Sequence, residues 1–264
     1  MKALAIACII ILLSATGLNA QGTASVNVSA FTLEAPQLQT QKKIWVYLPQ
    51  GYKDSHKKYP VVYMHDAQNL FDKSTSYSGE WHVDETLDSL KAQVIIVGIE
   101  HGNDKRLEEL TPYKNAKYGG GNADAYLSFI INTLKPHIDS LYRTKSNTKH
   151  TSIMGSSLGG LVSFYAVLKY PEVFGKAGVF SPSFWFSDEI YAKAGAAGKI
   201  KAKMYFMCGD DEDKDMVPNM QRMEKLIAPK SYKKYMKEKI IPGGKHNEAL
   251  WAKQFPQAFL WLMG

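Results

Sequence analysis

The chain has 264 residues, of which 45% are hydrophobic, 12% aromatic and 22% charged. These values lie near the average of globular proteins, and they exclude an intrinsically disordered or collagen-like chain. The formal net charge is +7, but the excess lysines are scattered as pairs instead of gathered with aromatic residues on one segment. We therefore expect a solvated basic surface and no nucleic-acid partner.

The first twenty residues have the pattern of a secretory leader. Lys2 precedes an apolar run over 3–13 that is too short to cross about 30 Å of hydrocarbon, and Leu18-Asn19-Ala20 offers a small-residue cleavage site. We predict that residues 1–20 are a cleaved signal peptide and that the mature protein is periplasmic or secreted, without stable membrane insertion. An uncleaved membrane anchor is the alternative.

The number and positions of the cysteines indicate a fold that is not stabilised by a disulfide bond. Of the two cysteines, Cys8 lies inside the predicted leader and would be lost on cleavage. Cys208 then has no partner, which excludes an intramolecular disulfide in the mature chain. A lipoprotein is disfavoured as well, because its cysteine should follow the apolar run, whereas Cys8 lies within it.

The predicted strands are short and apolar on both faces. After a polar lead-in over 21–40, which is an edge strand or an irregular segment, strands are predicted at 44–48, 60–64, 94–99, 153–154, 177–180, 204–207 and 239–241. Continuous apolar strands are typical of parallel sheets that are covered on both faces.

Helices are predicted between these strands at 124–141 and 158–169, and at the end of the chain over 247–262. The first helix has an apolar stripe for the core, made of Tyr126, Phe129, Ile130, Leu134 and Ile138. The last helix should point Leu250, Trp251, Phe255, Phe259 and Leu260 inward. Alternation of strands and helices predicts a single domain over 21–264, a three-layer α/β sandwich with a central, mostly parallel sheet.

A nucleophile candidate lies where a predicted strand meets a helix. Gly155-Ser156-Ser157-Leu158-Gly159 fits G-x-S-x-G with Ser157 in the centre, and the setting is the strand–turn–helix of a nucleophile elbow. The tight turn requires small neighbours, and the helix N-terminus favours an oxyanion beside the serine. The alternative is a glycine-rich turn that only packs a helix on a strand.

A serine hydroxyl needs a base, and His246 is the histidine whose position fits. It follows a predicted strand and the loop over 242–245, far downstream of the serine, as the order serine, acid, histidine requires. The acid should follow the strand over 204–207, where four acids stand close together. Glu212 has the reach to turn back toward the imidazole, Asp213 is the second candidate and Asp210 the third.

Metal chemistry has no support from the motifs. Asp211, Asp213 and Asp215 have the spacing of a calcium loop, but Met216 and Arg222 stand where that loop needs glycine and glutamate. No H-E-x-x-H or clustered Cys/His pattern is present. We therefore expect no metal and no cofactor.

Together these motifs resemble the esterase D family of α/β-hydrolases, which includes enterochelin-type esterases and the feruloyl and acetyl xylan esterases. The likeness runs from about residue 42 to the end of the chain. It rests on Val46-Tyr47-Leu48-Pro49 with Gly51-Tyr52, the segment 63–72, Gly79-Glu80-Trp81, the segments 155–160 and 209–212, Met216-Val217-Pro218, and Gly244-Lys245-His246-Asn247-Glu248 with Trp251.

The resemblance implies an α/β-hydrolase fold with Ser157 as nucleophile, His246 as base and Glu212 as acid. It also implies an oxyanion hole made by the backbone N–H groups of Leu158 and Gln68. The sequence departs from the family at Ala67, where glycine is usual. One methyl group is tolerated there if the backbone avoids positive φ.

The expected function is a serine carboxylic-ester hydrolase acting on a small-molecule or oligosaccharide ester, preferably an acylated carbohydrate. Trp81, Trp185, Phe184 and Phe186 could line an acyl or sugar pocket. For Phe184-Trp185-Phe186, a place in the core is the alternative. Arg106 could pair with a substrate carboxylate or with a neighbouring acid. The alternatives are a siderophore esterase, an acyltransferase using the same triad, and a catalytically silent secreted binding protein. The sequence does not predict an oligomeric state.

Overall fold

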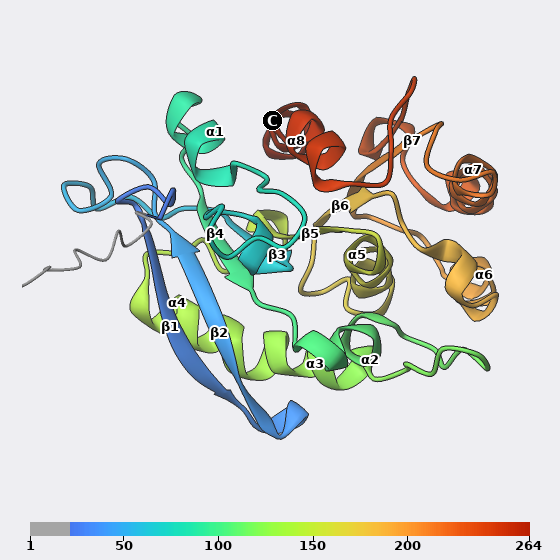
Figure 1. Cartoon of the computed structure of the whole chain (residues 1–264), viewed down its shortest axis with the longest axis horizontal. Helices are drawn as coiled ribbons and strands as arrows, with labels where there is room; N and C mark the ends of the chain where they lie inside the picture. Colours follow the sequence, from blue (N-terminus) through green and yellow to red (C-terminus); the bar gives the residue numbers. More distant parts are fainter. Residues whose placement is uncertain (1–21) are drawn as a thin grey trace, which may run out of the picture.

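The computed structural model of the chain describes residues 22–264 (Figure 1). The predicted leader and Cys8 lie outside the described residues. Eight strands form one sheet in the order β1-β2-β4-β3-β5-β6-β7-β8. Their bounds are β1 (Val28–Ala35), β2 (Thr40–Tyr47), β3 (Val61–His65), β4 (Ile95–Ile99), β5 (Thr151–Ser156), β6 (Lys176–Phe180), β7 (Lys203–Gly209) and β8 (Met236–Ile241).

The sheet is antiparallel at one edge and parallel elsewhere. β1 and β2 form an antiparallel hairpin through a 3-10 turn, η1 (Pro36–Leu38), and β2 pairs antiparallel with β4. All pairings from β4 through β3 to β8 are parallel. Of the two alternatives for the lead-in, the edge strand is the one that forms.

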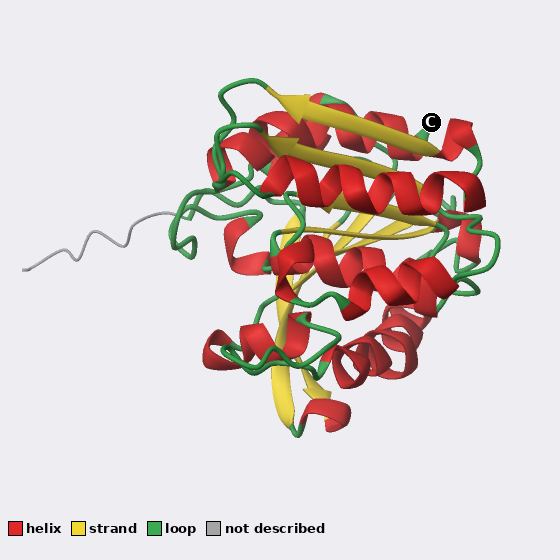
Figure 2. Cartoon of the chain, turned by 90° about the vertical axis from the view of Figure 1, so that its right-hand side faces the viewer, coloured by secondary structure: helices red, strands yellow, loops and turns green. Residues whose placement is uncertain are grey.

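Helices cover both faces of the sheet (Figure 2). α1 (Val83–Ser89) and α8 (Glu248–Met263) lie together at the top of Figure 1. The opposite face packs on α2 (Arg106–Leu110), α3 (Ala123–Phe129), α4 (Lys135–Leu141), α5 (Leu158–Lys169), α6 (Glu189–Ala196) and α7 (Met216–Ile227). The predicted three-layer α/β fold is therefore confirmed.

The side chains of each buried strand alternate between two hydrophobic cores, one on each face of the sheet. In β3, Tyr63 points into the core under α2–α7, whereas Val62 and Met64 point into the core under α1 and α8. Because successive side chains of a strand point to opposite faces, a strand that is apolar throughout can fill two cores at once. All five residues of β3 are buried.

Two helix predictions need correction. The segment predicted as one helix over 124–141 is α3 and α4 joined by a π-helical turn, Ile130–Leu134. Pro136, the second residue of α4, has no N–H to donate, so one hydrogen bond of the helix is missing just after this turn. The apolar stripe of this segment is buried as predicted. In α8 the prediction for Leu260 was wrong, since it is 54% exposed, about 100° around the helix from the buried Phe259.

Helices α1, α2, α6 and α7 were not predicted from the sequence. Cys208 is a buried free thiol in β7. Within residues 22–264, none of the helices combines the length and the apolar character that a bilayer span requires.

Candidate active site

Ser157 stands alone between a strand and a helix. β5 ends at Ser156 and α5 begins at Leu158, so the turn consists of this one residue. Its backbone has φ 58° and ψ −120°, a conformation that non-glycine residues rarely adopt and that is concentrated at functional sites. Its N–H donates to the carbonyl of Phe180 at 2.9 Å, which ties the turn to β6.

Close packing around the turn explains its glycines. A Cβ added at Gly155 would lie 2.8 Å from Cδ2 of His65, and one added at Gly160 would lie 2.7 Å from the carbonyl oxygen of Phe180. Gly159 has slightly more room, because its nearest neighbour would be Cβ of His65 at 3.3 Å. The turn is therefore sterically closed to larger residues on two sides.

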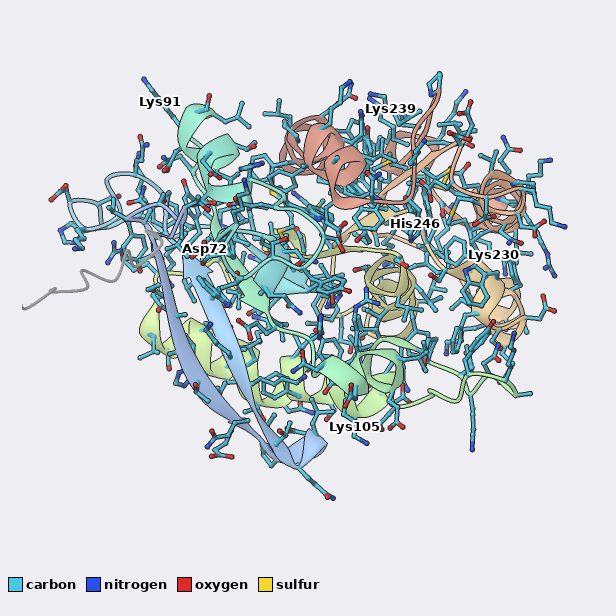
Figure 3. The ribbon with its side chains drawn as sticks, viewed as in Figure 1. Asp72, Lys91, Lys105, Lys230, Lys239 and His246 are labelled. Atoms are coloured by element: carbon cyan, nitrogen blue, oxygen red, sulfur yellow. The ribbon has the colours of Figure 1, made fainter. Side chains whose placement is uncertain are left out.

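His246 is held by Glu212. The Nδ1 atom of His246 lies 2.7 Å from Oε2 of Glu212. The other carboxylate oxygen accepts hydrogen bonds from the backbone N–H of Gly209 and from the hydroxyl of Ser181, both at 2.6 Å. The side chain of Glu212 is fully buried, whereas that of His246 is 34% exposed. His246 lies between α8 and α5 in the view of Figure 3.

The two competing acids make other contacts. Oδ1 of Asp213 accepts from the N–H groups of Asp215 and Met216 at 2.7 and 2.8 Å, just where α7 begins. Oδ1 of Asp210 accepts from the N–H of Gly243 at 2.7 Å and so fixes the loop that leads to His246. Of the three acids left open by the sequence, the structure brings Glu212 to the imidazole.

Ser157 and His246 line the same cavity of about 820 Å³. No hydrogen bond between the two side chains is present in the described part of the chain. Oγ of Ser157 instead lies 3.2 Å from Oγ of Ser183. The cavity is also lined by Trp81, which is 4% exposed and stacks on Phe180 with 5.6 Å between ring centroids.

The two oxyanion candidates lie at the starts of helical turns. Leu158 is the first residue of α5, where a backbone N–H has no acceptor within the helix. Gln68 belongs to a 3-10 turn, η2 (Ala67–Asn69), and lines the cavity. The unusual Ala67 is compatible with this turn, because the positive φ falls on Asp66 (58°) and not on Ala67.

Arg106 pairs with a neighbouring acid. Its Nε and one terminal nitrogen donate to the two oxygens of Asp66 at 2.7 and 2.9 Å. Lys43, which also lines the cavity, pairs with Glu100 at 3.1 Å. Both cationic side chains of the cavity are thus already neutralised by protein carboxylates.

Trp185 does not line the cavity beside Ser157. It is 50% exposed and packs edge-on against Tyr118 with 5.9 Å between ring centroids. Its neighbours Phe184 and Phe186 are buried in the core. Because the segment is a 3-10 turn, adjacent side chains diverge, and the tryptophan points away while the two phenylalanines point inward.

Burial keeps the histidine beneath the elbow neutral. Desolvation lowers the pKa of His65 to about 4, and its Nδ1 lies 2.8 Å from the hydroxyl of Tyr126. Its ring packs beneath Gly155. Burial also lowers the pKa of His101 and raises that of Glu248, the latter with help from the charge of Asp66.

Three residues near the candidate triad were not predicted to belong to it. Ser181 bridges Glu212 and Trp251, because its Oγ accepts from Nε1 of Trp251 at 2.8 Å. The Trp251 ring also meets His246 edge-on, with centroids 5.0 Å apart. Ser183 contacts Ser157 as described above. Both serines follow the end of β6, but no motif marks them, and Trp251 was predicted only as a core residue.

Comparison with known proteins identifies the family. Residues 35–262 match the family described as "Putative esterase". The uncharacterized protein YbbA of Bacillus subtilis is 29% identical over 242 residues, which cover 84% of this chain and 93% of that protein. An endo-1,4-beta-xylanase/feruloyl esterase of Xylanibacter ruminicola is 28% identical over 178 residues, or 64% of this chain and 22% of that protein.

The fold is shared with solved esterase structures. The enterobactin esterase FES from Shigella flexneri superposes with a TM-score of 0.74 at 16% identity, over 90% of this chain and 60% of that one. The chain thus has the fold of α/β-hydrolase esterases over most of its length. The chain therefore belongs to this esterase family, whose members are carboxylic ester hydrolases of the α/β-hydrolase fold.

Proposed function

We propose that the protein is a serine esterase that uses Ser157, His246 and Glu212 as a triad and hydrolyses acyl groups from carbohydrate. The observation that carries this proposal is the 2.7 Å contact between His246 and Glu212 beside the cavity that Ser157 also lines. A carboxylate on Nδ1 holds the proton there, which leaves Nε2 to accept the proton of the serine.

The reaction follows from these positions. Oγ of Ser157 attacks the ester carbonyl carbon while His246 takes the hydroxyl proton. The resulting oxyanion accepts hydrogen bonds from the N–H groups of Leu158 and Gln68, each contributing about 3–4 kcal/mol in the transition state. The carbon–oxygen bond to the alcohol then breaks, and His246 gives the alcohol its proton. Water, activated by His246, attacks the acyl-enzyme and releases the acid.

The cavity favours an uncharged ester. Among the described residues that line the cavity, the lysine and the arginine, Lys43 and Arg106, are both paired with acids, so neither is free to attract a multiply charged anion. Trp81 and Trp251 line the cavity with exposed fractions of 4% and 5%, and this apolar aromatic lining suits the ring of a sugar or of an aromatic acyl group. The name of the xylanase/feruloyl esterase relative agrees with this substrate class.

The proposal is tested with purified mature protein and a substrate panel read by mass spectrometry. The panel contains p-nitrophenyl acetate, feruloylated and acetylated oligosaccharides, and catecholate siderophores. We expect release of ferulate or acetate by the wild type and none by Ser157→Ala, with unchanged circular dichroism of the variant. Full activity of Ser157→Ala would refute the nucleophile assignment.

The acid is tested by comparing Glu212→Gln with Asp213→Asn. The glutamine loses the charge that orients and stabilises the imidazolium, and we expect kcat to fall by about 10³–10⁴. Asp213→Asn should change kcat less than tenfold, because that side chain contacts only the backbone at the start of α7. The reverse order of the two effects would overturn the choice of Glu212.

The panel also separates the other candidate functions. Faster cleavage of siderophores than of acyl sugars would favour a siderophore esterase, which the fold shared with the enterobactin esterase makes a specific alternative. Acylated products with added alcohols would identify an acyltransferase. A wild type that neither cleaves any ester nor reacts at Ser157 with a fluorophosphonate would be a silent binding protein. The proposal also includes export of the protein, which depends on the signal peptide predicted over residues 1–20.

A further inference from the structure

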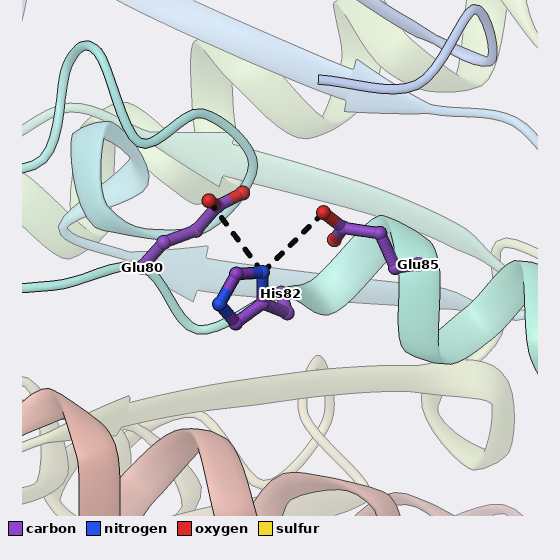
Figure 4. Close-up of side chains that lie close together, drawn as sticks. All are labelled: Glu80, His82 and Glu85. Atoms are coloured by element: carbon purple, nitrogen blue, oxygen red, sulfur yellow. Dashed lines mark hydrogen bonds and ion pairs between the residues drawn. The ribbon is translucent and has the colours of Figure 1, made fainter. Parts of the chain in front are cut away.

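A compact group of acids and one histidine lies just before and within α1, outside the proposed triad. Glu80, His82 and Glu85 each offer one ligand atom, and these atoms all lie within 4.8 Å of one another. Figure 4 shows both carboxylates pointing toward the same ring nitrogen of His82 from two sides. Sequence motifs gave no hint of this group, because its spacing matches none of the common zinc or calcium patterns.

The distances fit coordination better than simple hydrogen bonding. Nδ1 of His82 lies 3.5 Å from Oε2 of Glu80 and 3.3 Å from Oε1 of Glu85. Charge-assisted hydrogen bonds are shorter, about 2.7–2.9 Å. Ligand atoms at about 2.0–2.1 Å from a tetrahedral zinc ion are about 3.3–3.4 Å apart. Nδ1 of His82 thus lies at about the spacing of neighbouring corners from each carboxylate, and the ligand atoms of the two carboxylates lie within 4.8 Å of each other.

Glu80 supplies an independent indication of a missing partner. Its side chain is only 1% exposed. Oε2 accepts a hydrogen bond from the hydroxyl of Thr23 at 3.1 Å, but the buried Oε1 has no hydrogen-bond partner among residues 22–264. A buried carboxylate oxygen without a partner is costly, and a cation beside the group would remove that cost.

The surroundings add negative charge. Asp84 is fully buried, and Asp72 is 9% exposed. In the described part of the chain, no lysine or arginine forms an ion pair with either of them, with Glu80 or with Glu85. Asp72 thus adds negative charge beside Glu80, and Asp84 adds it beside Glu85, an arrangement that attracts a divalent cation.

We propose that Glu80, His82 and Glu85 bind one divalent transition-metal ion of the zinc class. One imidazole nitrogen with two carboxylate oxygens suits such an ion, whereas calcium and magnesium prefer oxygen ligands throughout. Glu80 and His82 flank Trp81, which lines the active-site cavity. By binding Glu80 and Glu85 together, the ion therefore links the loop that contains Trp81 to the first turn of α1.

The test measures metal binding and thermal unfolding, so it does not depend on the proposed function. Mature protein is treated with EDTA, dialysed at pH 7 and titrated with ZnCl2 by calorimetry, with unfolding followed by circular dichroism. We expect one zinc ion per chain and a rise in Tm of several degrees. CaCl2 at the same concentration should produce no such rise; an equal effect of calcium would overturn the assignment to a transition metal.

The substitutions are made at exposed side chains, so that the variants should fold. The side chains of His82 and Glu85 are 57% and 44% exposed. We use His82→Asn because residue 82 has φ 53°, a conformation that asparagine tolerates. His82→Asn and Glu85→Gln should each weaken zinc binding at least tenfold and abolish the rise in Tm. The exposed His56, replaced by alanine, and the exposed Glu172, replaced by glutamine, are the controls and should bind as the wild type does.

Unfolding temperatures measured in EDTA show whether Glu85 acts as a metal ligand or only stabilises the fold. In EDTA, Glu85→Gln should unfold at or above the wild-type Tm, because it removes one of the crowded negative charges. With zinc the order should reverse, since only the wild type is stabilised. Zinc binding that survives in both variants, or a variant Tm that falls in EDTA by as much as zinc raises the wild type, would overturn the proposal.

Discussion

At the scale of single residues, the carboxylate of Glu212 contacts three polar groups. One oxygen faces His246, and the other accepts from Gly209 and from Ser181, whose own hydroxyl accepts from Trp251. The chain of contacts therefore runs from the indole through the serine to the carboxylate and the imidazole. Because Ser181 and Trp251 are both buried, each hydrogen bond fixes the next group without competition from water.

Ser181→Ala tests this chain. The substitution keeps Cβ and the positive φ of 41° but removes a donor to Glu212 and leaves the buried indole N–H unpaired, at a cost of about 1–3 kcal/mol of stability. We expect kcat to fall about tenfold with KM little changed, measured on p-nitrophenyl acetate alongside urea unfolding. Ser183→Ala is the control for stability, since its hydroxyl contacts Ser157 and not Glu212. Wild-type stability and kcat in Ser181→Ala would contradict the proposed chain.

At the scale of elements, α7 packs an acid against β8. Glu224 of α7 lies beside Glu238 of β8, and its pKa is raised by burial, by a hydrogen bond to Glu238 and by the charge of that carboxylate. Folding therefore favours the protonated form. As the pH rises above about 4.5, the unfolded chain loses this proton while the folded chain keeps it, so the free energy of unfolding falls with rising pH.

Glu224→Gln should remove this dependence. The amide keeps the shape of the protonated acid but does not titrate. Between pH 5 and pH 8.5 we expect the wild type to lose more stability than the variant, and the variant to be the more stable protein at pH 8.5. Urea unfolding at pH 5, 7 and 8.5 measures both. Parallel pH curves for the two proteins would rule out the interpretation, and the exposed Glu172→Gln serves as the control.

At the scale of the whole molecule, the two ends of the parallel strands differ in charge. The carboxyl ends hold Glu212, Ser157 and the cavity that Ser157 lines, as is usual for open α/β sheets. At the opposite ends, a cavity of about 640 Å³ is lined by five lysines, Lys149, Lys176, Lys201, Lys203 and Lys234. Lys176 and Lys203 are direct partners on β6 and β7, and like charges in such positions are destabilising.

Lys176→Met measures the cost of this repulsion. The pKa of Lys176 is lowered to about 8 by burial and by the charges of Lys203 and Lys149. We expect the variant to be more stable than the wild type at pH 7 in low salt by up to about 1 kcal/mol, allowing for screening by solvent. The difference should shrink in 0.5 M NaCl, an ionic strength at which charges separated by more than about 5 Å are largely screened.

The stability of Lys176→Met should also depend less on pH than that of the wild type. Above about pH 8 the folded wild type releases the proton of Lys176 before the unfolded chain does, so wild-type stability should rise toward the variant's as the pH approaches 10. Lys135→Met is the control, because Lys135 pairs with Asp139 at 2.6 Å. That substitution should lower stability in low salt. A salt-independent difference for Lys176→Met would contradict the electrostatic explanation.

Much of the fold was predictable from local pattern alone. Buried strands such as β3 and β7 are apolar on both faces, and the stripe from Tyr126 to Ile138 has helical spacing, so their place in the core follows from one segment at a time. The short helices α1 and α2 lack such a long stripe and were missed. Leu260 was misplaced because its neighbour Phe259 fills the inward position and only one of the two can face the sheet.

The sequence by itself determined the elbow at Ser157, the histidine near the end of the chain and the acidic turn after β7, because glycines, order and strand ends are local properties. Only the tertiary structure brought Glu212, and not Asp210 or Asp213, to the imidazole of His246, paired Arg106 with Asp66 and placed Trp185 outside the cavity. It also brought Ser181 to Glu212. Such choices depend on distances of a few ångströms between segments far apart in the chain, and these distances are set by how the helices pack on the sheet.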